Sequence, residues 1–277
     1  MDKKETLKWT GERLVTEITN EDTIYHLHRY AIADDYIAGK VVVDIASGEG
    51  YGANLAAKKA KQVYGIDISD QAVAFAAKKY KATPNLGFMT GSVDAIPLES
   101  HIADVVISFE TLEHTDKHHE MMREIKRVLK PGGILIISSP DKAYYSDMFD
   151  RTNPFHVKEL YFNEFKELLN KYFKISFFYH QTFLTGSFMI KESYAGNSIT
   201  EYSGDYLNTS SAKGLTFPLF NIAVASDKPF NEPETSFFKG EDTMREMYFK
   251  RVMGFTPYRL GNAILRPLRI LKKLLNR

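Results

Sequence analysis

Residues 41–52 read VVVDIASGEGYG. The first five residues are mostly β-branched and predict a short buried strand. The glycines behind them predict a tight turn that opens a helix, where unpaired backbone amides face a ligand at close range. Gly48, Gly50 and Ala53 also satisfy the spacing of a dinucleotide-binding turn, so this segment alone does not separate NAD from S-adenosylmethionine.

Downstream of this turn, apolar runs alternate with helix-patterned segments, which predicts repeated βαβ units. The expected strands are 41–45, 62–67, 86–90, 104–109, 134–139, 174–180 and 220–226. The expected helices are 51–60, 70–80, 116–129 and 161–172. We therefore predict an α/β fold with a seven-stranded, mostly parallel sheet, helices on both faces and an antiparallel last strand.

The rest of the chain is expected to flank this sheet. Residues 1–39 are predicted to form N-terminal helices that cap the ligand, and 40–226 form the main domain. Within it, 141–160 is predicted to be a loop over the site, and about 183–218 an irregular insertion. Residues 227–277 are predicted to be a basic amphipathic tail.

Composition excludes several classes of protein. The 277 residues, 44% of them apolar, can fill a real core, which excludes a disordered chain. Because cysteine is absent, disulfides, thiolate metal sites and thiol nucleophiles are excluded, and a reducing, cytoplasmic location is expected. The charged and polar start of the sequence predicts that there is no secretory signal, and no apolar run approaches the ~20 residues that a spanning helix needs. The formal net charge of +1 predicts no nucleic-acid partner.

Three aspartates follow three successive strands. Asp44 ends the first, Asp67 ends the second, and Asp94 follows the third within GSVDAIPL. Carboxyl ends of parallel strands meet at one edge of a sheet, so these side chains are expected to converge. Asp44 would repel a pyrophosphate but attract a cationic amino-acid moiety, which favours S-adenosylmethionine over NAD. Asp67 is placed to accept from ribose hydroxyls, and Asp94 from the adenine amine.

The motifs DIASGEGYG, GIDIS, GSVDAIPL, DVVISFETLEH and RVLKPGG, in this order, resemble the landmarks of the Rossmann-type (class I) S-adenosylmethionine-dependent methyltransferases over about residues 10–230. More narrowly, TGERLV at 10–15, HLHRYAIA at 26–33 and NPFHVKEL at 153–160 resemble methyltransferases of bacterial polysaccharide and O-antigen gene clusters. One departure is Ala46, which stands at the position of the family's usual first glycine and still permits a tight turn.

The resemblance implies that S-adenosylmethionine is the cofactor. The residues implied to hold it are Asp44, Ala46, Ser47, Gly48 and Gly50 near the methionine moiety, Asp67 at the ribose, Ile68 against the adenine, Ser92, Val93 and Asp94 at the adenine edge, and Glu110 beyond the fourth strand. Arg13 and Arg29 precede the first strand; either pairs with the cofactor carboxylate or forms an ion pair at the surface.

Methyl transfer requires an aligned acceptor and, for a hydroxyl, a group that takes its proton. His156, in the predicted loop, is the first candidate for this base; the alternative is a loop histidine that bonds backbone and closes the lid. His114, oriented by Glu113, is the second; the alternative is that this segment supports the cofactor pocket.

Substrate contacts are expected from Tyr144, Tyr145 and Asn153, although loop tyrosines also serve in simple packing. No metal site is predicted, because His118 and His119 are adjacent on a helix and lack the spacing of metal ligands.

From Lys250 to the end there are eight basic residues and no acidic ones, with leucines at helical spacing. This pattern predicts either an interfacial helix on anionic lipid or a helix that docks on its own domain or on a second copy of the chain. An anionic membrane surface, reached peripherally at the inner face of the cell membrane, a glycosyltransferase and a homodimer are therefore the expected partners.

The sequence thus predicts an O-methyltransferase that acts on a sugar hydroxyl of a bacterial surface polysaccharide or its precursor. One alternative is a methyltransferase for a small aromatic or quinone-like acceptor. Another is a non-catalytic S-adenosylmethionine-binding scaffold in a glycan assembly complex. A third is an NAD-dependent oxidoreductase.

Overall fold

The computed structural model describes residues 13–183, 187–195, 199–204, 209–256, 260–261 and 265. The strands are β1 Val41–Ile45, β2 Gln62–Asp67, β3 Leu86–Thr90, β4 Ala103–Phe109, β5 Leu129–Pro140, β6 Ile175–Phe183, β7 Ser187–Lys191, β8 Thr200–Gly204, β9 Thr209–Lys213, β10 Phe220–Ser226 and β11 Ser236–Phe238. The helices are α1 Glu21–Ile37, α2 Tyr51–Ala56, α3 Asp70–Lys79, η1 Leu112–His114, α4 His118–Val128, α5 Lys142–Tyr145, η2 Asp147–Phe149, α6 Phe162–Tyr172, α7 Glu192–Ala195 and α8 Glu241–Gly254.

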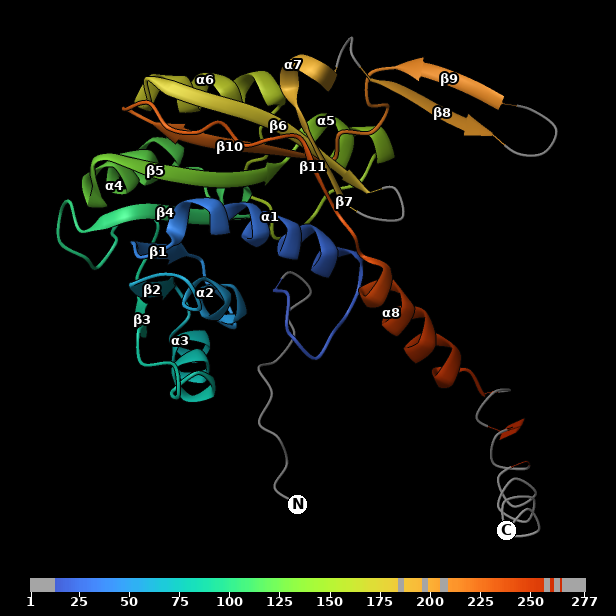
Figure 1. Ribbon diagram of the computed structural model, residues 1–277, viewed down its shortest axis with the longest axis horizontal. Coiled ribbons are helices and arrows are strands. Elements are labelled where there is room, and N and C mark those ends of the chain that lie inside the picture. Colours follow the sequence, from blue (N-terminus) through green and yellow to red (C-terminus); the bar gives the residue numbers. More distant parts are fainter. Residues whose placement is uncertain are drawn as a thin grey trace.

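The main sheet is mixed and has nine strands, in the order β11-β7-β6-β10-β5-β4-β1-β2-β3 (Figure 1). All seven predicted strands are present, and β10 is antiparallel to both β5 and β6, as predicted. The prediction of seven strands in a mostly parallel sheet was nevertheless wrong, because β7 and β11 extend the sheet beyond β6 through antiparallel pairing. Both are short, five and three residues, so neither shows a strand-like periodicity in the sequence.

Two other segments predicted to be irregular contain regular elements. The insertion at about 183–218 contains β7, α7 and the antiparallel pair β8–β9, which projects away from the main sheet (Figure 1). The predicted loop at 141–160 contains α5 and η2. The predicted helix 51–60 was too long, since α2 ends at Ala56 and single turns continue the chain.

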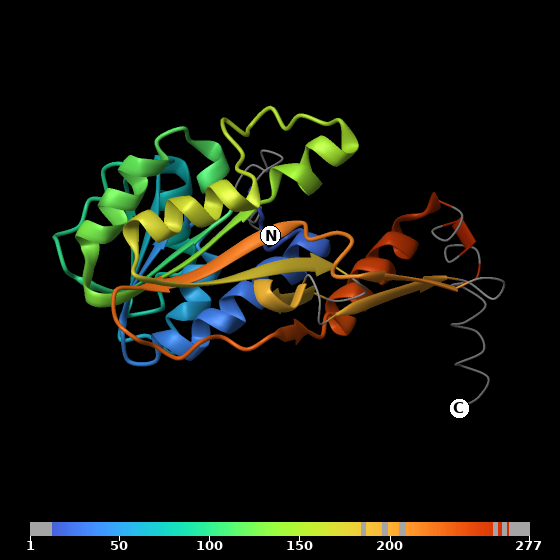
Figure 2. The ribbon, with the colours of Figure 1, turned by 90° about the horizontal axis from the view of Figure 1, so that it is seen from above.

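Helices cover both faces of the sheet, with α4 and α6 on one face and α1 and α2 on the other (Figure 2). Strand residues therefore alternate between two apolar layers. Val43 and Val106 pack toward α4 and α6, whereas Val42 and Val105 pack toward α1 and α2. Each such side chain contributes roughly 1.5–3 kcal/mol when fully buried, which holds the helices firmly on the sheet.

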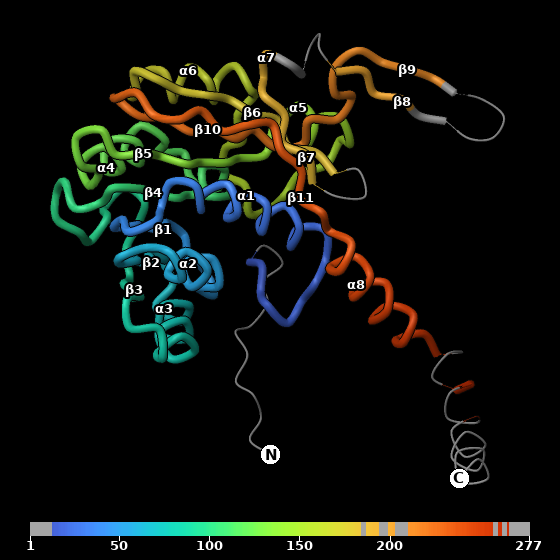
Figure 3. Tube along the Cα trace, viewed as in Figure 1, coloured from blue at the N-terminus to red at the C-terminus, as the bar shows by residue number. Residues whose placement is uncertain are grey.

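Helix α1 is the only helix among the described residues that precede β1. It begins at a capping box, in which the Asn20 side chain accepts from Thr23 N and the Thr23 hydroxyl accepts from Asn20 N. The helix runs across the sheet (Figure 3). It thereby carries Arg29 and Tyr30, both buried, to the edge where the parallel strands end.

At the C-terminal side, α8 extends away from the sheet (Figure 1). Six of the eight basic residues of the predicted tail, Arg259, Arg266, Arg269, Lys272, Lys273 and Arg277, lie outside the described residues. In the part of the chain that the structure describes, no helix combines the length and the apolar character needed to cross a membrane.

The strand order reverses direction at β1. The chain passes from β1 to β2 and β3 on one side and returns to β4 and β5 on the other, with β1 paired in parallel to both β2 and β4. Connections that leave in opposite directions open a crevice at the carboxyl ends of these strands. The turn from β1 into α2 lies at this crevice.

That turn is left-handed at three positions. Ala46 and Gly48 both have φ of 57°, and Gly50 has φ of 86°. A Cβ on Gly50 would lie 2.6 Å from the Phe88 ring, so a glycine is required there on steric grounds as well. Ala46 instead carries strain that a glycine would avoid, because a left-handed conformation costs an L-residue about 1–2 kcal/mol.

We expect Ala46→Gly to raise the free energy of unfolding by about 0.5–1 kcal/mol, since relief of strain exceeds the extra flexibility of glycine in the unfolded chain. Gly48→Ala, at the same φ, should lower it by about 1 kcal/mol. A Cβ there would meet Arg13 Cγ at 3.4 Å, an ordinary contact, so strain rather than collision is tested. Urea unfolding of both variants checks this; equal signs for the two changes would contradict it.

Candidate active site

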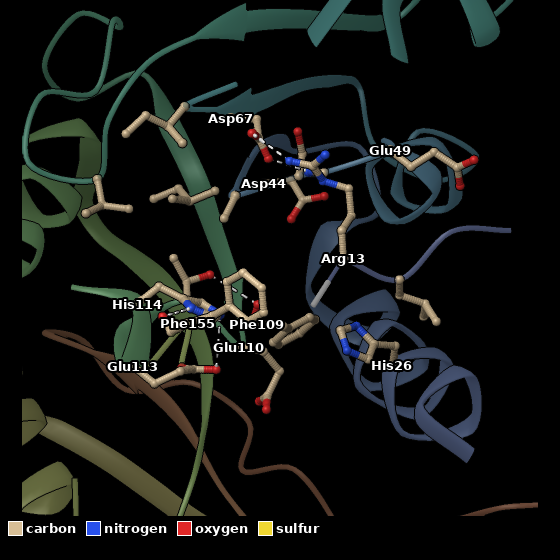
Figure 4. Close-up of a pocket in the computed structure, with 18 of the residues that line it drawn as sticks. Arg13, His26, Asp44, Glu49, Asp67, Phe109, Glu110, Glu113, His114 and Phe155 are labelled. Carbon is tan, nitrogen blue, oxygen red and sulfur yellow. Dashed lines mark hydrogen bonds and ion pairs between the residues drawn. The ribbon is translucent and has the colours of Figure 1, made fainter. Parts of the chain in front are cut away.

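A cavity of about 740 Å³ lies at the carboxyl ends of β1, β2 and β4. Asp44 and Asp67 lie on one side of it, and Glu113 and His114 lie on the other (Figure 4). The predicted site residues that line it are Arg13, Arg29, Asp44, Ala46, Ser47, Gly48, Asp67, Ile68, Ser92, Val93, Asp94, Glu110, Glu113, His114, Tyr145 and His156. The fold therefore brings most of the predicted residues together.

Three predicted residues do not line the cavity. Gly50 forms the turn beneath it. The Tyr144 ring packs edge-on against Phe217, with 6.2 Å between centroids. Asn153 Oδ1 accepts from Phe155 N at 3.0 Å and shapes the loop. The placement of these side chains indicates structural roles.

Asp44 is a buried carboxylate at the end of β1, and a side chain of helix α1 holds it in place. It is 1% exposed, and the Tyr30 hydroxyl donates to its two oxygens at 3.2 and 3.3 Å. Burial raises the pKa of Asp44 to about 7, the nearby Asp67 raises it further, and the Tyr30 hydrogen bond opposes the shift. The site therefore holds a poorly solvated carboxylate that a cationic ligand would stabilise.

Asp67 is bound on three sides. It accepts from Gly48 N at 2.8 Å and from Ser69 N at 2.9 Å, and Arg13 Nη2 lies 3.7 Å from it. The next residue, Ile68, is 76% exposed although it is apolar and lines the cavity. A fixed acceptor beside an exposed apolar side chain is suited to a sugar hydroxyl next to a flat ring.

Asp94 lies at the rim of the cavity beside Ser92, whose hydroxyl donates to it. Lys117 Nζ donates to the other oxygen at 2.6 Å. The Lys117 ammonium, and after it the Ser92 hydroxyl, lowers the pKa of Asp94. This carboxylate is therefore ionised and can accept a hydrogen bond from a ligand.

Arg29 is completely buried, so the prediction of a surface ion pair was wrong for this residue. Its Nε donates to Gln181 Oε1 at 2.8 Å, and its Nη1 lies 3.0 Å from Glu110 Oε1. The guanidinium also lies over the Phe220 ring, 4.5 Å from its centroid. Nη2 has no hydrogen-bond partner among the described residues, which leaves a donor at the cavity wall.

Glu113, His114 and His156 form a group on the far side of the cavity, which we call the His–Glu cluster. His114 and His156 pack edge to face with centroids 5.1 Å apart. His114 Nε2 lies 3.9 Å from Glu113 Oε1, too far for the predicted hydrogen bond that would orient the ring. Its Nδ1 instead donates to Phe155 O at 3.0 Å.

His156 is held by Tyr145, a predicted site residue, and by Glu159, which the sequence did not single out. Its Nδ1 lies 2.5 Å from Glu159 Oε1, and the Tyr145 ring stacks on it with centroids 5.2 Å apart. Ser146 Oγ also donates to Glu159 Oε1 at 2.8 Å. The imidazole is therefore oriented by a carboxylate.

Sequence reasoning missed Tyr30 and Glu49, which organise the cofactor side. Glu49 is fully buried, accepts from Thr16 N at 2.8 Å and is paired with Lys79 at 2.6 Å. A charged residue between two glycines was a signal for it. Tyr30 lies within the quoted HLHRYAIA segment, but only the packing of α1 on β1 shows its contact with Asp44.

The raised pKa of Asp44 leads to a stability prediction. The folded protein keeps its proton up to about pH 7, whereas the unfolded chain releases it near pH 4. The contribution of Asp44 to the free energy of unfolding is therefore fully present below pH 4 and is lost as the pH rises to 7. Between pH 5 and 7, the free energy of unfolding of Asp44→Asn should rise relative to that of the wild type by about 1 kcal/mol per pH unit. Above pH 7 the difference between the two proteins should remain constant.

Urea unfolding across this pH range measures the effect. Asp242→Asn, at a fully exposed position on α8, is the control for general effects of charge. A constant difference between Asp44→Asn and wild type across the range would show that Asp44 does not titrate there.

Comparisons with known proteins agree with this geometry. Residues 43–137 match a family of methyltransferase domains (Methyltransf_11). A probable S-adenosylmethionine-dependent methyltransferase from Mycolicibacterium smegmatis is 34% identical over 166 residues, which are 59% of this chain and 63% of that protein. A demethylmenaquinone methyltransferase from Chlorobaculum tepidum is 34% identical over 134 residues, 47% of this chain and 49% of that one. The chain thus spans 63% of the length of the first relative and 49% of the length of the second.

Among solved structures, a possible histamine N-methyltransferase from Thermotoga maritima has a TM-score of 0.53, with 17% identity. The alignment covers 74% of this chain and 90% of that one. At this identity the likeness shows the fold alone. Residues 43–137 are thus similar to methyltransferase domains, and the chain shares its fold with this solved structure.

Proposed function

We propose that the protein is an S-adenosylmethionine-dependent methyltransferase that methylates a hydroxyl oxygen. The observation that carries this proposal is the division of one cavity into two sides. Acidic groups that suit the cofactor lie on one side, and the His–Glu cluster lies on the other (Figure 4). A methyl donor and a hydroxyl to be deprotonated need this combination.

The donor set fits the cofactor group by group. Asp44, buried and without a lysine or arginine partner among the described residues, suits the positive charge of the amino acid and the sulfonium. Asp67 suits the ribose hydroxyls, and Ile68 with Asp94 suits the adenine ring and its amine. A pyrophosphate would lie against the Asp44 carboxylate, which disfavours NAD.

The reaction needs little from the protein beyond alignment and removal of a proton. The cofactor supplies a methyl group on a positively charged sulfur; the acceptor oxygen takes the methyl, and the sulfur keeps the electron pair of the broken bond. The His–Glu cluster lies where it can take the hydroxyl proton. Arg29, whose Nη2 lacks a partner among the described residues, is placed to stabilise negative charge at the cavity wall.

The proposed acceptor is a sugar hydroxyl of a bacterial surface polysaccharide or its precursor. This choice is supported by the resemblance of NPFHVKEL, which contains both His156 and the Glu159 that orients it. A small aromatic or quinone-like acceptor is the second candidate. It is favoured by aromatic walls, including Tyr25, Phe109 and Phe220, and by a relative named as a demethylmenaquinone methyltransferase.

Cofactor binding is tested by calorimetry with S-adenosylhomocysteine and NAD. We expect 1:1 binding of S-adenosylhomocysteine and none of NAD, and at least a tenfold loss of affinity in Asp67→Ala. Because the cationic amino group pairs best with an ionised Asp44, the wild-type Kd should fall about five- to tenfold from pH 6 to 7.5. Asp44→Asn should bind weakly with little pH dependence. Preference for NAD would reverse the proposal.

Transfer is tested with labelled S-adenosylmethionine and two sets of acceptors, sugars with free hydroxyls and hydroxylated aromatics. We expect label on a sugar oxygen, and a fall in kcat of about 100-fold in His156→Ala with unchanged affinity for S-adenosylhomocysteine. His119→Ala, an exposed histidine on α4, is the matched control. Tight cofactor binding with no transfer to either set would favour the non-catalytic scaffold.

A further inference from the structure

The His–Glu cluster has the composition of a metal site. Glu113 and His114 belong to η1, directly after β4, and His156 comes from the loop before α6. One ligand atom from each of the three residues lies within 4.8 Å of the others. Donor atoms around one ion are separated by about 3–4 Å, given bonds of ~2.0–2.2 Å, so small side-chain rotations would close the group.

The loop that supplies His156 is anchored to η1 by its backbone. Val157 N and Lys158 N both donate to Glu113 O, at 2.8 and 3.0 Å. The two segments therefore keep a fixed relation although they are far apart in sequence. A rigid approach of this kind is what a coordination site requires.

Each imidazole is oriented by a hydrogen-bond partner at its Nδ1 atom. His114 Nδ1 donates to a backbone carbonyl, Phe155 O, which places the lone pair on Nε2, the nitrogen that faces Glu113 Oε1. His156 Nδ1 is bonded to the Glu159 carboxylate. In metal sites the ligating histidines characteristically donate their second N–H to a carbonyl or a carboxylate, which fixes the ring and increases its basicity.

No lysine or arginine among the described residues is paired with the carboxylates around the cluster, Glu113 and Glu159. Glu49, Asp67 and Glu110 each pair with a lysine or an arginine. Glu113, 2% exposed, and Glu159, with a buried Oε2 that lacks a hydrogen-bond partner, have no such pair among the described residues. Two buried carboxylates without a lysine or an arginine partner are costly unless another cation joins them.

We propose that Glu113, His114 and His156 bind a divalent transition-metal ion, with Glu159 orienting one of the histidines. Two imidazole nitrogens and one carboxylate suit Zn²⁺, Co²⁺ or Fe²⁺ better than Mg²⁺ or Ca²⁺, which take oxygen ligands. The sequence predicts no metal site, because its neighbouring histidines lie on one helix without ligand spacing. The proposed site instead joins residues that only the fold brings together.

The role of the ion rests on the proposed function. Placed opposite the cofactor side, the metal would bind the acceptor oxygen and lower the pKa of its hydroxyl. The hydroxyl then releases its proton to water near neutral pH, and the oxygen retains the electron pair with which it takes the methyl group. The His–Glu cluster would in this way promote, through the ion, the loss of the hydroxyl proton that the proposed function requires.

Metal binding is tested on the full chain, stripped with a chelator, by titration with Co²⁺ in the absence of cofactor and acceptor. We expect one Co²⁺ per chain, with the visible absorption bands of nitrogen-ligated cobalt. His114→Ala and His156→Ala should each lower the affinity by at least about 100-fold, and Glu159→Gln by about 10–100-fold. His119→Ala, an exposed histidine outside the cluster, should bind Co²⁺ as the wild type does.

Circular dichroism of each variant separates loss of the site from loss of the fold. Should an alanine variant unfold, the near-isosteric Glu113→Gln and Glu159→Gln serve in its place. No stoichiometric Co²⁺ in the wild type, or equal binding in these variants and the wild type, would overturn the proposal. Co²⁺ binding without methyl transfer would leave the metal site standing and contradict the proposed function instead.

Discussion

The parallel pairing of β1 with both β2 and β4 is the constraint on which the rest of the structure depends. Asp44 is aligned with Gly65 in β2 and with Ile107 in β4, so the three strands end near one level. Asp67 and Glu110, which end or follow these neighbours, therefore arrive at the same edge as Asp44. A chain that paired β1 in antiparallel would place these carboxylates at opposite edges of the sheet, and no common cavity would form.

Several carboxylates lie close together at that edge, and the fold stabilises them differently on the two sides of the cavity. On the cofactor side, Asp67 and Glu49 are held by backbone amides and by Arg13 and Lys79, while Asp44 is left with a tyrosine hydroxyl as its side-chain donor. On the other side, Glu110 is neutralised by Arg29, but Glu113 has no comparable partner among the described residues. Asp44 and Glu113, which lack a lysine or arginine partner among the described residues, both line the cavity.

Helix α1 links these two sides. Tyr30 reaches Asp44, whereas Arg29, the preceding residue, reaches Glu110 and Gln181. Because both side chains come from one helical turn that is packed on the sheet, the positions of the two halves of the cavity are coupled. Close packing makes such an arrangement stiff, so a shift of α1 would change the distance between the cofactor side and the acceptor side.

The sequence by itself determined the parts that depend on local pattern. The bounds of β1, β2, β3 and β10, the glycine turn, and the convergence of Asp44, Asp67 and Asp94 all follow from apolar periodicity and from the rule that parallel strands end together. Only the tertiary structure decided which distant side chains meet. Packing of the elements on one another determines three features: the contact of Tyr30 with Asp44, that of His156 with His114, and the place of β7 and β11 at the edge of the sheet. Neither apolar periodicity nor secondary-structure propensity predicts these contacts, because they depend on the whole core rather than on any one segment.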